Sequence, residues 1–253
     1  MAFTDEDLRG GPSAATAAAD AGEALARAAL ALARRLSTGA TMWCVAPEWP
    51  EHSRHVAVEF VHPVIVGKPA LSAVSVDAAD PVDALRTLVS PGDIVVTIGT
   101  TTDNEVRRVV QRCEAWGALS IWIGAGPRPD RCLADHLLWV DDSPHEVAHD
   151  GRLVFQYHVL WELAHVCLEH PGLLGATDAC GEDENLCITC SDEGRLGEVV
   201  AIDAGTTMVR TAAGIEPTDT TLVGTRHQGD LVLIHAGVAI AIVDDAGGGR
   251  GRT

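Results

Sequence analysis

Short apolar runs of β type alternate with helix-compatible segments over the first two thirds of this chain, and this alternation constrains the fold most. The run at 93–98, Asp-Ile-Val-Val-Thr-Ile, has the apolar character of a strand that is covered on both faces. Strands separated by amphipathic helices favour βαβ units and a parallel sheet. The runs lie at 41–46, 70–76, 93–98, 118–123 and 137–140, and the candidate helices at 13–36, 50–61, 104–116 and 154–168.

The pattern changes after Gly172. Short β-like runs follow there with Gly, Pro and Asp between them and no helical spacers, which is typical of a small all-β barrel. The stretch 175–185 is small, polar and acidic, like an exposed linker. The β-like runs lie at 197–203, 207–211, 220–224 and 230–234. We therefore predict a doubly wound α/β domain over 1–174, a linker over 175–186, an OB-like barrel over 187–243 and a flexible tail over 244–253.

Charge and composition exclude several classes of partner. The 18 Lys and Arg against 36 Asp and Glu give a formal net charge of -18, which repels phosphate backbones and anionic lipids. No apolar run approaches the roughly 20 residues of a membrane span, and the acidic start differs from a secretory signal. The 7 scattered cysteines do not resemble a disulfide framework. We expect a cytoplasmic protein that binds neither nucleic acid nor membranes.

Two of the candidate helices carry polar side chains at the spacing of metal ligands. His55 and Glu59 are four residues apart and share one helical face. His158, Glu162 and His165 share one face of the later helix in the same way. Imidazole and carboxylate groups suit zinc or iron. A polar stripe of helix surface or a dimer interface would have the same spacing, so both interpretations stay open.

A second candidate metal site lies in the C-terminal part of the chain. Cys187 and Cys190 form a C-x-x-C pair that can hold one soft metal ion, and His235 could add an imidazole. Spacing alone favours two accidental thiols in a loop over a metal site.

Residues 187–240 resemble the hydrogenase-assembly chaperone family HypC/HupF. The segment 229–240, Gly-Asp-Leu-Val-Leu-Ile-His-Ala-Gly-Val-Ala-Ile, matches the closing motif of that family nearly letter for letter. The resemblance implies that Cys187 holds iron with cyanide and carbon monoxide ligands and that His235 belongs to the iron-handling surface. The implied partners are a HypD-like scaffold and the hydrogenase large subunit. Cys187 is internal, unlike the N-terminal cysteine of the family, and Cys190 is extra relative to the shortest relatives.

Residues 13–172 resemble the SIS (sugar isomerase) fold, nearest to the phosphoheptose isomerase type GmhA. The family cradles phosphate on two loops, and the resemblance assigns Thr100, Thr101 and Thr102 of the second loop to that role. The first loop departs from the pattern, because Pro47 lacks an N–H donor and Glu48 repels an anion. An N-cap region would have the same Thr and Asp residues as the second loop.

The same family places a metal between two helices, with a His-x-x-x-Glu pair on the first of them. His55 and Glu59 reproduce that pair, so the resemblance implies zinc or another divalent ion. It also implies a homodimer or higher oligomer. The candidate ligands are His55, Glu59, His158, Glu162 and His165.

Taken together, these features lead us to expect a nickel–iron hydrogenase maturation protein with an appended SIS-like domain that binds metal or a small ligand. The alternative is a sugar-phosphate isomerase or a regulatory protein that senses sugar phosphates. The altered first loop argues against isomerase activity, and we assign no catalytic residue.

Overall fold

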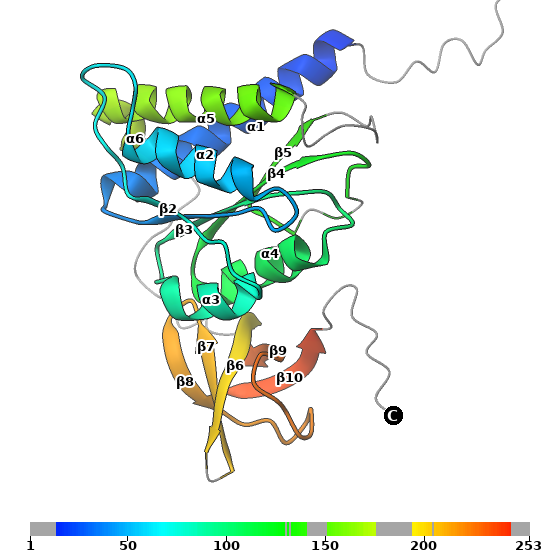
Figure 1. Cartoon of the computed structure of the whole chain (residues 1–253). Coiled ribbons are helices and arrows are strands. Elements are labelled where there is room, and N and C mark those ends of the chain that lie inside the picture. The colour runs from blue at the N-terminus through cyan, green and yellow to red at the C-terminus, as the bar shows by residue number, and fades with distance from the viewer. Residues whose placement is uncertain are drawn as a thin grey trace, which may run out of the picture.

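The computed structural model describes residues 14–129, 131, 133–140, 151–175, 194–203 and 205–243. The first domain is built on a parallel sheet of five strands in the order β2-β1-β3-β4-β5 (Figure 1). Its central strand β3 is buried at every position, as its continuous apolar sequence predicts. The strands are β1 (Met42–Val45), β2 (Ala73–Ser75), β3 (Ile94–Ile98), β4 (Leu119–Ala125) and β5 (His136–Val140).

Helices cover both faces of this sheet, so the expected doubly wound α/β architecture is confirmed. α1 (Ala14–Ser37), α2 (Pro50–Val61) and α5 (Gly151–Glu169) pack on one face, and the short α6 (Pro171–Leu174) follows α5. The other face is covered by α3 (Pro81–Leu88) and α4 (Asn104–Trp116), as Figure 1 shows.

Local signals explain where the helices of the second face begin and end. Asp103 caps α4, and Gly117 closes it in the left-handed conformation with φ 70°. The sequence analysis missed α3, although Asp80 caps it and Pro81 occupies its first turn. This helix is only 8 residues long, too short for a clear amphipathic period.

The second domain is an antiparallel sheet of five strands in the order β10-β9-β6-β7-β8. The predicted strand at 220–224 is wrong, because those residues lie in a turn region and the third strand of this domain is instead β8. The two edges of the sheet meet at one bridge, where Asp219 N donates to Gly237 O (2.9 Å) and Ala239 N donates to Asp219 O (2.8 Å). A closed OB-like barrel remains a prediction. The strands are β6 (Arg195–Asp203), β7 (Thr206–Thr211), β8 (Gly214–Thr218), β9 (Leu231–His235) and β10 (Val238–Val243).

The two domains are joined by a buried ionic contact. The Glu198 side chain on β6 has no exposed surface and accepts hydrogen bonds from Arg86, Arg112 and the Trp116 indole. In return, Arg210 on β7 donates to the carbonyl oxygens of Arg86 and Val89, at the end of α3. The second domain therefore packs against α3 and α4, on the face of the sheet opposite to α2 and α5.

The predicted linker, apart from Gly175, and the predicted tail lie outside the described residues. Among the described helices, we find none with the length and apolar character that a membrane crossing requires.

Candidate metal centre

Three of the predicted ligands meet where α2 and α5 face each other. His55 Nε2 lies 3.2 Å from Glu59 Oε1 and 3.3 Å from His158 Nε2. The third side of the triangle, from His158 Nε2 to Glu59 Oε1, is 3.6 Å. The two imidazoles are 41% and 44% exposed while Glu59 is 18% exposed, so the cluster lies at the surface with its carboxylate on the inner side.

Behind this triangle lies a tyrosine that the sequence analysis did not single out. Tyr157 is buried, and its hydroxyl lies 2.8 Å from His55 Nδ1, the ring nitrogen opposite the one that faces Glu59. The same hydroxyl is 3.4 Å from Nδ1 of the buried His52. Burial, and to a smaller extent the charge of Glu59, raise the pKa of Tyr157 to about 12. The phenol therefore stays protonated and able to donate.

The sequence contains only a weak indication that Tyr157 contacts His55. Tyr157 directly precedes His158, and His52 precedes His55 by one helical turn. Neighbours in sequence on a helix point to different faces, so the spacing alone did not suggest that Tyr157 would reach a ligand on another helix.

The two remaining residues of the predicted cluster lie elsewhere. Glu162 faces Lys68, with the Nζ atom 3.8 Å from Oε1, and Lys68 also pairs with Glu169 at 2.8 Å. His165 is fully buried, with Nδ1 3.0 Å from Trp161 O and Nε2 3.3 Å from Pro69 O. Glu162 and His165 therefore contact other residues and do not belong to the triangle of His55, Glu59 and His158.

The predicted phosphate loop ends at the capping residue of α4. Thr100 and Thr102 share a hydrogen bond of 2.8 Å between their hydroxyls, and the Thr101 hydroxyl donates to Pro127 O at 3.2 Å. Asp103 is buried and accepts hydrogen bonds from the amides of Glu105 and Val106. The three threonine hydroxyls thus have protein partners.

The candidates in the C-terminal part are only partly described. Cys187 and Cys190 lie outside the described residues. His235 ends β9 and is half-buried. Of the other cysteines, Cys44 and Cys113 are buried as free thiols, and burial raises the pKa of both.

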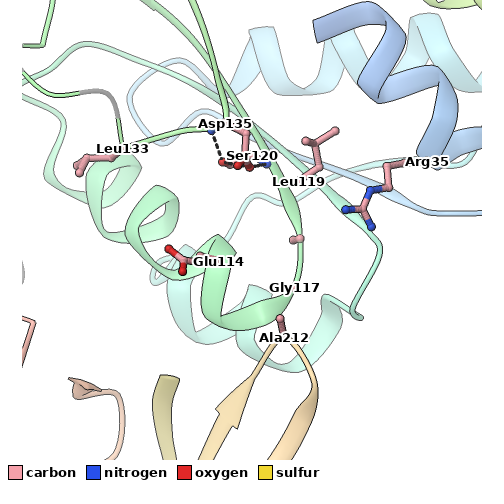
Figure 2. Close-up of a pocket in the computed structure, with 9 residues that line it drawn as sticks. Arg35, Glu114, Gly117, Leu119, Ser120, Leu133, Asp135 and Ala212 are labelled. Atoms are coloured by element: carbon pink, nitrogen blue, oxygen red, sulfur yellow. Dashed lines mark hydrogen bonds between the residues drawn. The ribbon is translucent and has the colours of Figure 1, made fainter. Parts of the chain in front are cut away.

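A separate cavity of about 330 Å³ lies at the amino end of β4, beside the hairpin between β7 and β8 (Figure 2). Arg35 lies on one side of it and Glu114 on another. The Asp135 carboxylate accepts hydrogen bonds from the amide and hydroxyl of Ser120. None of the residues that line this cavity belongs to the metal cluster.

Of the comparisons with known proteins, only the comparison with solved structures finds similar proteins. No protein-family model and no curated protein matches this sequence. A phosphoheptose isomerase from Francisella tularensis is 16% identical, with a TM-score of 0.48 over 61% of this chain and 93% of its own. The phosphoheptose isomerase GmhA from Neisseria gonorrhoeae is 16% identical, with a TM-score of 0.47 over 60% of this chain and 91% of its own. The sugar isomerase domain of an RpiR transcription factor from Sphaerobacter thermophilus is 17% identical, with a TM-score of 0.43 over 60% of this chain and 81% of its own.

These findings overturn the expected role in hydrogenase maturation. The similar structures are sugar isomerases and an isomerase domain of a regulator, and nothing supports a HypC/HupF chaperone domain. The structure also explains why the motif at 229–240 misled. Ala236 and Gly237, at φ 48° and 79°, form a two-residue hairpin turn, and the alternate residues Val232 and Ile234 enter the core. These residues satisfy the needs of an antiparallel hairpin whether or not it handles iron.

Proposed function

We propose that the first domain binds one divalent metal ion, zinc in the first instance, on His55, Glu59 and His158, and that it is an enzyme of the sugar-isomerase type. The observation that carries the proposal is the close triangle of two imidazole nitrogens and one carboxylate oxygen. When bound, such an ion supplies a Lewis acid that polarises a carbonyl or hydroxyl oxygen of the substrate.

The dimensions of the triangle support zinc. Tetrahedral zinc with bonds of about 2.0–2.2 Å separates neighbouring ligand atoms by about 3.3–3.6 Å. The three distances of 3.2, 3.3 and 3.6 Å agree with one face of that tetrahedron. Three protein ligands leave the fourth position for water or substrate, which is the arrangement of catalytic rather than structural zinc sites. The partial exposure of both imidazoles supports access from solvent.

Tyr157 supports the same assignment by holding His55. A neutral imidazole that binds metal through Nε2 carries its proton on Nδ1 and donates it to a neighbour. The Tyr157 hydroxyl is in place to accept it at 2.8 Å, and the hydroxyl proton can then point toward His52. Tyr157 thus positions the ring of His55 and fixes which nitrogen has the free lone pair.

The sugar-type substrate is carried over from the names of the similar solved structures. Interconversion of an aldose and a ketose moves a proton between neighbouring carbons and develops negative charge on the substrate oxygen. A site for this chemistry needs an electrophile at that oxygen and a polar surrounding that is already ordered. The cluster between α2 and α5 combines a candidate electrophile site with a buried tyrosine and histidine behind it.

Elemental analysis of the full chain, purified without chelator, tests the metal centre. We expect about one equivalent of zinc or another divalent ion, and less than about a tenth of an equivalent in His55→Ala, Glu59→Gln and His158→Asn, because each removes one of three ligands. Glu162→Gln is the matched control: it removes a carboxylate from the predicted stripe that pairs with Lys68 instead. Metal content that is absent, or unchanged in the three ligand variants, would contradict the proposal.

Proton exchange tests the chemistry. NMR of aldoses and ketoses in heavy water should show deuterium entering the carbon next to the carbonyl with the metal-loaded protein. The exchange should stop in His55→Ala and persist in Glu162→Gln. A loaded protein that exchanges no proton in a panel of free and phosphorylated sugars would leave a binding site without isomerase activity.

A further inference from the structure

The carboxyl ends of β1 and β3 form the place where the strand order reverses. In the order β2-β1-β3-β4-β5, the chain leaves β1 toward one edge of the sheet and returns on its other side at β3. Open α/β sheets bind their ligands in the crevice outside the strand ends at this reversal. Here the loops 46–49 and 99–103 follow the two strand ends at this reversal.

The N-terminus of α4 follows the loop 99–103, and a helix N-terminus is an element that can hold a phosphate. Its free amides and helix dipole favour an anion. The carboxylate of Asp103 already occupies this position. Its Oδ1 atom accepts hydrogen bonds from the Glu105 amide at 3.0 Å and from the Val106 amide at 3.1 Å. A phosphate at this helix end would therefore meet a carboxylate in its position.

Asp103 is a fixed and buried charge rather than a mobile surface one. The residue is 3% exposed, and its Oδ2 atom has no hydrogen-bond partner within the described part of the chain. That atom packs against Gly99, where an added Cβ would lie 3.1 Å from it. Burial raises the pKa of Asp103, because little water reaches the carboxylate. Its two hydrogen bonds to the α4 amides hold the carboxylate at the helix end.

The loop 46–49 at the end of β1 also disfavours a bound anion. Burial and the charge of Asp103 together raise the pKa of Glu48, so the two carboxylates act on one region. Pro47 has no amide proton to offer, and α2 begins with Pro50 and Glu51. The two prolines thus offer no amide to an anion, and the carboxylates of Glu48 and Asp103 repel it.

We infer that Asp103 is a specificity-determining residue that excludes phosphate groups from the N-terminus of α4, so that the substrate of the metal centre is a sugar without a phosphate group at this position. The statement about substrate rests on the proposed function. The exclusion of phosphate does not, because it depends only on the end of α4.

Binding measurements on the full chain test the exclusion, with inorganic phosphate, glucose 6-phosphate and glucose as probes. Metal is first removed by dialysis, so the result is independent of the metal centre. We expect wild type to bind glucose 6-phosphate no more tightly than glucose. Asp103→Asn keeps the helix cap and removes the charge, and it should raise phosphate affinity about tenfold or more, the effect of a like charge within a few ångström. Asp103→Gly should raise it further, because it also vacates the amides at little cost to the helix.

Asp135→Asn is the control, since it removes the same charge at the opposite end of the sheet and should leave phosphate affinity unchanged. Circular dichroism checks that each variant is folded. The inference is overturned if wild type binds glucose 6-phosphate more tightly than glucose, or if neither Asp103 variant gains affinity over Asp135→Asn. A protein that excludes phosphate in this way but holds no metal would contradict the proposed function alone.

Discussion

Replacement of Glu198 by alanine should lower the free energy of unfolding, because it removes the buried ionic contact between the two domains. This side chain has no exposed surface, and its Oε1 atom lies 2.9 Å from Arg86 Nη2 and 3.2 Å from Arg112 Nε. Its Oε2 atom accepts from the Trp116 indole at 2.7 Å. Burial alone would lower the pKa of Arg86, but the hydrogen bond and charge of Glu198, together with the charges of Asp83 and Asp80, outweigh burial and raise that pKa. Both guanidinium groups therefore lose a buried anionic partner when this carboxylate is removed, although Arg86 keeps its contact with Asp83 at 2.6 Å.

The expected loss follows from what Glu198→Ala leaves behind. Removing one partner of a buried ion pair costs about 3–5 kcal/mol, because the remaining charge stays out of water without compensation. Arg112 is 3% exposed at its side chain and Arg86 15%, so neither regains much hydration without the domains moving apart. For a chain of this size, each kcal/mol changes the melting temperature by about 2–4 °C, which predicts a decrease of about 6–20 °C.

Urea unfolding and calorimetry measure this loss, with Glu216→Ala as the matched control. Glu216 also pairs with an arginine of the second domain, at 2.9 Å, but its side chain is 30% exposed and that of Arg195 is 47% exposed. Such a pair is worth less than about 1 kcal/mol. If Glu198→Ala costs no more than Glu216→Ala, the buried contact does not hold the domains together and the reasoning is refuted.

Two further predictions concern the first domain. Tyr157→Phe should weaken zinc binding about 10–100-fold in a chelator competition, because His55 loses its hydrogen-bond partner; equal affinity would mean that Tyr157 only packs there. Burial raises the pKa of Asp103 above its ordinary 3.8, so the folded state keeps this proton to higher pH than the unfolded state and loses stability as pH rises through that window. Asp103→Asn should remove this loss, so its unfolding free energy relative to wild type should increase as pH rises above 3.8; parallel urea profiles would contradict the predicted shift.

Local signals in the sequence were enough to define several elements of the first domain. Helices α2 and α4 have the predicted bounds, because Pro50 begins one and Asp103 and Gly117 delimit the other. The strand at 94–98 follows from a run that is apolar on both faces. These features depend on neighbours in the chain, which a sequence shows directly.

Local signals in the sequence did not show which segments pair as strands. Residues 214–218 and 220–224 are both short segments between turn residues, and only the first pairs with β7. The motif at 229–240 met the requirements of a hairpin and was mistaken for one of iron handling. A short motif of small and apolar residues can meet the structural requirements of a β-hairpin without indicating any particular function.

The candidate metal centre divides in the same way between sequence and tertiary structure. Helical spacing determined that His55 and Glu59 share a face, and that His158, Glu162 and His165 share another. Only the packing of α5 against α2 decided which members meet. His158 reaches Glu59, whereas His165, two turns further along α5, lies at the carbonyl oxygen of Pro69. The periodicity of one helix fixes which side chains lie in line, but the place where a second helix packs against it depends on every residue in the interface between them.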